Sequence, residues 1–351
     1  MSMRLPKDKQ VSELVFASFN QDYGCIACAT QRGFCIFNSD PLKERFRRDF
    51  ENGGIGIVEM LFRSNILGLV GSGTNPKFPD NKAMIWDDYQ NKCIAELEFK
   101  SEVKAIKLRR DRIVVVLENK VYVYNFADLQ LLHQIETSPN PKGLCALSAS
   151  PNIVLAVPGL KPGTVHVELY DLKQTQIINA HNNGLTQLVL SLDGSKLATS
   201  SERGTLVRLW DTKTGAQTRE LRRGADKADI YSLAFSSNLE WLCVSSDKGT
   251  VHIYGLSAEH DKREEENRKK NEEAKTRVSS FSFMKEILPS YFSSEWSFAS
   301  FHIPETHSIC CFGSDSNSVI VVSADGSYYK YSFDRTKGGE CKQETMAKFL
   351  K

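Results

Sequence analysis

The chain has 351 residues, of which 41% are hydrophobic and 25% are charged, proportions that are typical of a soluble globular protein. Its 45 basic and 43 acidic residues give a formal net charge of +2, which excludes the broad positive field of a nucleic-acid-binding domain. The first ten residues lack the apolar stretch of a signal peptide, no apolar run is long enough to span a bilayer, and the nine cysteines are odd in number, so we expect a cytoplasmic protein with reduced thiols.

A short pattern recurs seven times along the chain: a strand of alternating apolar residues ends on an aromatic residue, which is often followed by Asp. From the first copy to the sixth, the interval between these aromatic residues is 38 to 49 residues. A blade of a WD-type propeller has roughly 40–45 residues, so we expect each copy to mark one blade. The marks are Phe37, Trp86, Tyr124, Tyr170, Trp210, Tyr254 and Tyr331. They predict an all-β fold, a seven-bladed β-propeller of WD-repeat type, which occupies residues 1–351 as a single domain.

Strand–turn–strand units precede several of these marks, most clearly at residues 196–205, 241–250 and 319–327. After the last mark, residues 340–350 can supply one more strand. Residues 13–19 can pair near that strand, so we expect these two segments to close the ring.

The interval between the last two marks is 77 residues, which predicts a long insertion at residues 257–292. Its charged part, residues 259–277, has seven acidic and seven basic side chains and is expected to be a flexible, solvated loop. Its apolar part, residues 278–292, contains Phe281, Phe283, Met284, Ile287 and Leu288. These side chains either cover the side of the last blade or form an interfacial segment that dips into lipid headgroups.

Patterns for catalysis, metals or cofactors are weak. Cys25 and Cys28 fit C-x-x-C, but they lie in a strand-like run without a second pair or a histidine at zinc spacing, so we interpret them as core residues. The glycine-rich run at residues 68–73 lacks the G-x-G-x-x-G spacing of a dinucleotide site. We therefore predict no enzyme activity, no cofactor and no metal site. The alternative interpretation is a propeller enzyme.

The feature that points to a function is the basic sequence Leu221-Arg222-Arg223-Gly224. It follows the mark at Trp210 by a short turn, so we expect it on the outermost strand of the fifth blade. Successive side chains of a strand point to opposite sides, so the two arginines would serve two pockets. The planar fork of arginine binds phosphate oxygens in pairs. Histidine, hydroxyl and glycine donors suited to an inositol phosphate are available in the fifth and sixth repeats: His181, as a cation, with Thr199, Ser201, Gly204, Thr205 and Arg208, and Ser246, Thr250 and His252.

Each basic or polar motif also has a plain structural interpretation. The Arg222–Arg223 pair can simply be a charged edge that blocks aggregation. The basic run at residues 107–112 is interpreted as a solvated connection between strands. Asn20, Gln21 and Asp22 form an ordinary turn or a polar rim for a protein partner.

With these motifs, the chain resembles the PROPPIN family, the WD-repeat phosphoinositide-interacting (WIPI) proteins of autophagy. Within this family it is most similar to the branch with shorter chains, types three and four. The resemblance covers nearly the whole chain. It is carried by residues 19–22, 58–63, 84–88, 103–117, 140–144, 221–224, 245–253 and 324–329. The L/F-R-R-G signature is short, but it is specific within a chain of seven repeats.

The resemblance implies two headgroup sites, one on either side of the strand with Arg222 and Arg223. The first site would use His181, Thr199, Ser201, Gly204, Thr205, Arg208 and Arg222. The second would use Arg223, Ser246, Thr250 and His252. Thr199 stands where some relatives have serine, and its hydroxyl keeps the donor.

The resemblance further implies recognition of phosphatidylinositol 3-phosphate and phosphatidylinositol 3,5-bisphosphate. The apolar residues of the insertion would enter the membrane, and the turn with Asn20 and Asp22 would bind an autophagic lipid-transfer protein. We expect a cytoplasmic monomer, without nucleic acid, that associates peripherally with autophagic (phagophore) and endosomal membranes. The alternative is a WD-repeat protein–protein scaffold in which the arginines are structural.

Overall fold

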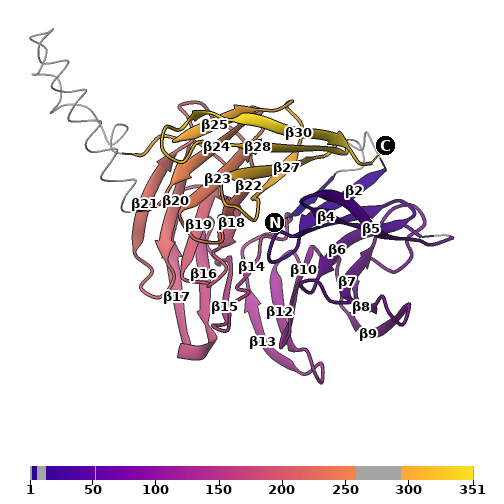
Figure 1. The fold of residues 1–351 in the computed structure, drawn as a ribbon. Coiled ribbons are helices and arrows are strands. Elements are labelled where there is room, and N and C mark those ends of the chain that lie inside the picture. The colour runs from indigo at the N-terminus through magenta and orange to yellow at the C-terminus, as the bar shows by residue number, and fades with distance from the viewer. Residues whose placement is uncertain (1, 6–12, 52, 258–293, 351) are drawn as a thin grey trace, which may run out of the picture.

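In the computed structural model, residues 2–5, 13–51, 53–257 and 294–350 are described. Their strands form seven sheets that follow one another in chain order around a central axis, as in a seven-bladed propeller (Figure 1). One 3-10 helix, η2 (Tyr170–Leu172), is present among the described residues. The predicted all-β, seven-bladed fold is confirmed.

The strands of the first four sheets are as follows. Blade 1 has β1 (Ser2–Arg4), β2 (Leu14–Phe19), β3 (Cys25–Thr30), β4 (Gly33–Ser39) and β5 (Leu42–Asp49). Blade 2 has β6 (Ile55–Met60), β7 (Ile66–Gly71), β8 (Lys82–Asp87) and β9 (Lys92–Glu98). Blade 3 has β10 (Ala105–Arg109), β11 (Arg112–Val116), β12 (Lys120–Asn125) and β13 (Leu131–Glu136). Blade 4 has β14 (Ala146–Leu147), β15 (Val154–Pro158), β16 (Thr164–Leu169) and β17 (Gln174–Asn179).

The remaining sheets complete the ring. Blade 5 has β18 (Leu185–Leu190), β19 (Lys196–Ser201), β20 (Leu206–Asp211) and β21 (Gln217–Arg222). Blade 6 has β22 (Ile230–Phe235), β23 (Trp241–Ser246), β24 (Thr250–Gly255), β25 (Ala299–His302) and β29 (Gly339–Glu340). Blade 7 has β26 (Ser308–Phe312), β27 (Ser318–Ser323), β28 (Ser327–Ser332) and β30 (Lys342–Lys348).

Every recurring aromatic mark lies on, or directly after, the third strand of the four that build each blade: β4, β8, β12, β16, β20, β24 and β28. The side chains of these strands are buried or partly buried because each sheet packs between two others. On β20, Val207 and Leu209 pack toward blade 6, whereas Trp210 packs against blade 4. The aromatic residue therefore recurs because each blade needs a large side chain to fill the gap to its neighbour.

The ring closes by side-chain packing between its first and last blades, which lie side by side in Figure 1. β30 is the fourth strand of blade 7, as expected for residues 340–350. β2, however, pairs with β1 and β3 inside blade 1, so the expectation that residues 13–19 pair near the last strand is wrong. Leu14 and Ile26 share an apolar cluster with Ile309, and the rings of Phe37 and Phe349 meet at 5.0 Å. Apolar burial between complete blades replaces the missing backbone pairing.

The predicted insertion lies almost entirely outside the described residues. Its charged part at 259–277 and its apolar part at 278–292, with Phe281, Phe283, Met284, Ile287 and Leu288, therefore stay predictions. The described chain resumes at Ser294, beside blade 5, and then enters β25 of blade 6.

Candidate functional site

The strand β21 is the outermost strand of blade 5, as the sequence predicts. It ends at Arg222, and Arg223 is the next residue along the chain. It begins after a tight turn in which the Asp211 carboxylate accepts the Thr214 N–H at 2.9 Å and Gly215 takes a positive φ of 70°. Leu221 is fully buried among the apolar residues between blades 5 and 6, which fixes the strand against the propeller. The arginines are thus held on the circumference by a rigid sheet.

The strand register places the two arginines on opposite sides of the blade. Arg222 pairs across the sheet with Leu206, two residues from Arg208, whose side chain reaches the Ala180 carbonyl beside blade 4. Leu221 faces blade 6, and Arg223 follows that same alternation. The Arg223 guanidinium lies close enough to His252 of blade 6 to lower the pKa of that imidazole. One arginine therefore serves the gap between blades 4 and 5, and the other serves the gap between blades 5 and 6.

The side of Arg222 carries a compact polar cluster. Thr199, Arg208 and Glu220 stand in register across β19, β20 and β21. The Thr199 hydroxyl lies 3.0 Å from His181 Nε2 and accepts a hydrogen bond from the Trp210 indole at 2.9 Å. Arg208 donates to the Glu220 carboxylate at 3.0 Å. Ser201 is buried two residues along β19 from Thr199, on the same face.

Two residues assigned to the first site by the resemblance contact Arg223 through their backbone carbonyls. The Gly204 carbonyl accepts from Arg223 Nε at 3.1 Å, and the Thr205 carbonyl accepts from the Arg223 N–H at 2.9 Å. Glycine is required at position 204 because φ is +63° and an added Cβ would lie 1.7 Å from the Ala228 carbonyl oxygen. This turn holds the Arg223 side chain in place.

The side of Arg223 is bounded by strands of blade 6. Thr250, His252 and Tyr254 alternate along β24 on the face toward blade 5, and Ser246 is buried at the end of β23. His252 Nδ1 lies 3.1 Å from the Ser297 hydroxyl. The Tyr254 hydroxyl donates to the Arg222 carbonyl at 2.9 Å, which ties this side of the site to β21.

Both histidines are neutral at pH 7 in the ligand-free protein, and the cationic imidazole expected for a bound inositol phosphate stays a prediction. Burial, and then the Arg208 charge, lower the pKa of His181 to about 4. Burial and the Arg223 charge lower the pKa of His252 to about 4 as well. A nearby guanidinium disfavours a second positive charge, and the buried position removes the water that would stabilise it. A bound anion would offset the arginine charge and so raise the pKa of each imidazole.

The sequence analysis did not identify the acidic and serine partners of Arg208, Arg219 and Arg222. Glu220 was visible from the strand alternation, since it lies two residues before Arg222 and so on the same side. Glu295, which pairs with Arg219 at 2.8 Å, and Ser294, whose hydroxyl accepts from Arg222 Nε at 2.7 Å, had no sequence signal. They come from a part of the chain more than 70 residues away.

The turn predicted to contact a protein partner divides into a buried and an exposed residue. Asn20 is 4% exposed, accepts the Cys25 N–H at 2.9 Å and donates to the Phe62 carbonyl at 3.2 Å, so it holds the turn between blades 1 and 2. Asp22 lies on the surface and pairs with Arg63 at 3.0 Å. Within this turn, Asp22 is thus the accessible residue of the two.

The basic run at residues 107–112 is a solvated connection only at its turn: Arg110 and Asp111 are exposed between β10 and β11, whereas the flanking basic side chains contact neighbouring blades. Arg109 donates to the carbonyls of Ser148 and Pro151 in the neighbouring blade at 3.1 and 2.8 Å. Lys107 pairs with Glu59 at 3.0 Å, and both side chains are largely buried. These side chains join blades 2, 3 and 4 through carbonyl and carboxylate acceptors of the neighbouring blades.

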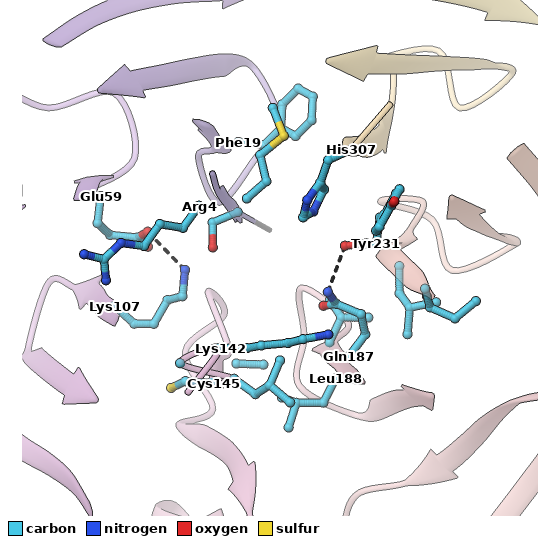
Figure 2. A pocket seen from close by; sticks show the side chains of 18 of the residues that line it. Arg4, Phe19, Glu59, Lys107, Lys142, Cys145, Gln187, Leu188, Tyr231 and His307 are labelled. Carbon is cyan, nitrogen blue, oxygen red and sulfur yellow. Dashed lines mark hydrogen bonds and ion pairs between the residues drawn. The ribbon is translucent and has the colours of Figure 1, made fainter. Parts of the chain in front are cut away.

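A cavity of about 840 Å³ lies on the axis, bordered by the first strands of the blades and the loops that lead into them. Figure 2 shows the paired Lys107 and Glu59 on one side and Tyr231 stacked on His307, with ring centroids 4.2 Å apart, on another. Its charged lining residues balance, with Arg4, Lys104, Lys107 and Lys142 against Glu59, Asp229, Glu305 and Asp325. At the rim, by contrast, Arg208, Arg219, Arg222 and Arg223 meet Glu220 and Glu295. Of these two places, the rim has the positive excess that an anion needs.

Two further features are absent from the described residues. No helix there is long and apolar enough to cross a bilayer. No group of three His, Cys, Asp or Glu side chains there is arranged to hold a metal ion.

Comparison with known proteins places the whole chain among related sequences. The family model described as PROPPIN matches residues 13–348. Autophagy-related protein 18e of Arabidopsis thaliana is 40% identical over 342 residues, which cover 95% of this chain and 88% of that protein. Autophagy-related protein 18 of Dictyostelium discoideum is 35% identical over 343 residues, with coverage of 94% and 91%.

Solved structures share the fold at lower identity. Kluyveromyces lactis Hsv2 superposes with a TM-score of 0.75 at 22% identity, over 95% of this chain and 98% of that one. KlAtg21, solved in complex with the coiled-coil of AgAtg16, gives the same TM-score and identity.

Proposed function

Because this chain belongs to the PROPPIN family, whose curated relatives are autophagy-related proteins, we propose that it is a non-catalytic effector of autophagy that binds phosphoinositides. Its ligands are the headgroups of phosphatidylinositol 3-phosphate and phosphatidylinositol 3,5-bisphosphate. The protein associates peripherally with phagophore and endosomal membranes and recruits other machinery there.

The observation that carries this proposal is the placement of Arg222 and Arg223 at the end of an outermost strand, on its two sides. Each arginine has a hydroxyl-bearing side chain and a neutral imidazole on its side of the blade. A guanidinium offers paired donors to phosphate oxygens, and hydroxyls serve the ring hydroxyls of an inositol. A merely charged edge does not require such donors on both flanks.

Two such sites on one rigid rim bind two lipids of the same membrane. Once the first headgroup is bound, the second binding event is intramolecular, so the combined affinity exceeds that of one site by roughly 10²–10⁴. Modest affinity at each site is then sufficient for membrane recruitment, and the rest of the propeller stays available to proteins.

Flotation with lipid vesicles tests this function. The wild-type chain is expected to float with vesicles that contain phosphatidylinositol 3-phosphate, and the double variant Arg222→Ala, Arg223→Ala is expected to stay in the protein fraction. The matched control is Arg47→Ala with Arg48→Ala, since these residues are also adjacent arginines on an outermost strand, β5 of blade 1. Equal flotation of all three proteins would favour the scaffold function without specific lipid binding.

We further propose that Asp22 contributes to binding an autophagic lipid-transfer protein, since it is the exposed acidic residue of a turn that Asn20 holds rigid. Asp22→Lys is expected to reduce capture of that protein at least several-fold while vesicle flotation stays unchanged. Asp128→Lys, a charge reversal in an exposed turn of blade 3, is the control. Undiminished capture by the Asp22 variant would remove this residue from the interface.

A further inference from the structure

The described segment at residues 294–297 crosses from the edge of blade 5 to blade 6, whose outer strands β21 and β25 are neighbours at the rim in Figure 1. Glu295 adds to the edge of β21 in parallel: its N–H donates to the Glu220 carbonyl at 3.0 Å, and its carbonyl accepts the Arg222 N–H at 2.6 Å. The Glu295 carboxylate also pairs with Arg219 at 2.8 Å. The segment is therefore attached to the strand that carries the arginines.

The serines of this segment contact both candidate sites. The Ser294 hydroxyl accepts a hydrogen bond from Arg222 Nε at 2.7 Å. The Ser297 hydroxyl lies 3.1 Å from His252 Nδ1, on the side of Arg223. Ser294 is 5% exposed, and Arg222 and Arg223 are 7% and 8% exposed. In this conformation a headgroup on a flat membrane has little access to either guanidinium.

We propose that the 294–297 segment is a latch that occupies both headgroup sites and that bound phosphate displaces. This inference rests on the proposed function and concerns the regulation of the same sites. The Ser294 oxygen takes a position on Arg222 Nε that a phosphate oxygen would take, and Ser297 does the same at His252. Phosphate carries negative charge, so its hydrogen bonds to arginine are stronger than those of a neutral hydroxyl.

The latch couples the two sites because one short segment contacts both. When a headgroup displaces Ser294 from Arg222, the segment loses part of its attachment to β21, and Ser297 is held less firmly at His252. The second headgroup then binds a site that is already partly open. The apparent affinity of each site equals its intrinsic affinity multiplied by the fraction of molecules in which the latch is open. Binding of the first lipid opens the latch, so the second lipid binds without this loss of affinity.

The affinity for vesicles gives the first test, with phosphatidylinositol 3-phosphate in phosphatidylcholine as the probe. Ser294→Ala, which changes no charge, is expected to bind about 3- to 10-fold more tightly than wild type, because one hydrogen bond to a charged group no longer has to be displaced. Ser195→Ala, in an exposed turn of blade 5, is the control and is expected to match wild type. Equal or weaker binding by Ser294→Ala would overturn the latch.

Amide hydrogen exchange without lipid gives a second readout. Because Ser294 helps to hold Glu295 on β21, Ser294→Ala is expected to accelerate exchange of the Arg222 and Glu295 amides at least several-fold, with no change in blade 1. Unchanged exchange would reject the latch whatever the lipid result. If the amides exchange faster in Ser294→Ala but the wild-type protein does not bind vesicles, only the proposed function is rejected. Lipid binding by wild type, with loss in the double arginine variant and no gain in Ser294→Ala, would reject the latch alone.

Discussion

Replacing either Arg222 or Arg223 alone by Ala should weaken binding to vesicles with phosphatidylinositol 3-phosphate by about 10²-fold or more. Each change removes hydrogen bonds of a charged group, which are worth about 1.5–3 kcal/mol at one site. It also leaves the protein with one functional site, so the roughly 10²–10⁴-fold advantage of divalent attachment is lost. Sedimentation with vesicles over a range of lipid concentrations measures the change.

The two single variants should behave alike, because the sites lie on opposite sides of β21 and each is needed for divalent binding. Arg47→Ala on β5 is the matched control and should bind like wild type. A Lys replacement at either position should give an intermediate loss, since Lys keeps the charge but not the planar fork. A single variant that binds vesicles as tightly as wild type would contradict the two-site account.

Binding should also strengthen as the pH falls from 7.5 to 5.5, by about tenfold relative to a variant without the two histidines. His181 and His252 have pKa values lowered to about 4 by burial and by their arginine neighbours, so the free protein holds them neutral. A bound phosphate raises both pKa values toward their ordinary range, so the complex holds more protons than the free protein. The form with more protons is favoured at lower pH, which gives the sign of the effect.

The double variant His181→Asn, His252→Asn is needed for comparison because the phosphate itself takes up a proton with a pKa of about 6, which weakens binding at low pH. His133→Asn, at a distant position in blade 3, controls for histidine loss as such. Titrations of a soluble inositol 1,3-bisphosphate at several pH values measure both slopes. Equal slopes for wild type and the double histidine variant would show that neither imidazole takes up a proton on binding.

The fold could be predicted because its signal is local and repeated. A strand of alternating apolar residues that carries a large aromatic residue near its end is recognisable in the sequence, so Trp86 and Trp210 each identified the third strand of a blade. The short turn after Trp210 placed Arg222 on the outermost strand of blade 5. Ring closure was harder, because no local pattern tells whether residues 13–19 pair with the last blade or only pack against it.

The parts of the site that escaped prediction depend on contacts between distant residues or on the electrostatic environment. Ser294 and Arg222 are 72 positions apart and meet only because the chain crosses from blade 5 to blade 6. The neutral state of His252 follows from its burial and from the Arg223 charge, neither of which a sequence pattern gives. Arg109 was wrongly interpreted as solvated because its carbonyl partners belong to a turn of the next blade.

The central claim is that adjacent arginines serve two separate headgroup sites, and calorimetric titration with soluble inositol 1,3-bisphosphate tests it most directly. Wild type should bind two equivalents, Arg222→Ala and Arg223→Ala one equivalent each, and the double variant none. A single equivalent in wild type that disappears with either substitution would mean that both guanidinium groups hold one phosphate, and the account would be wrong.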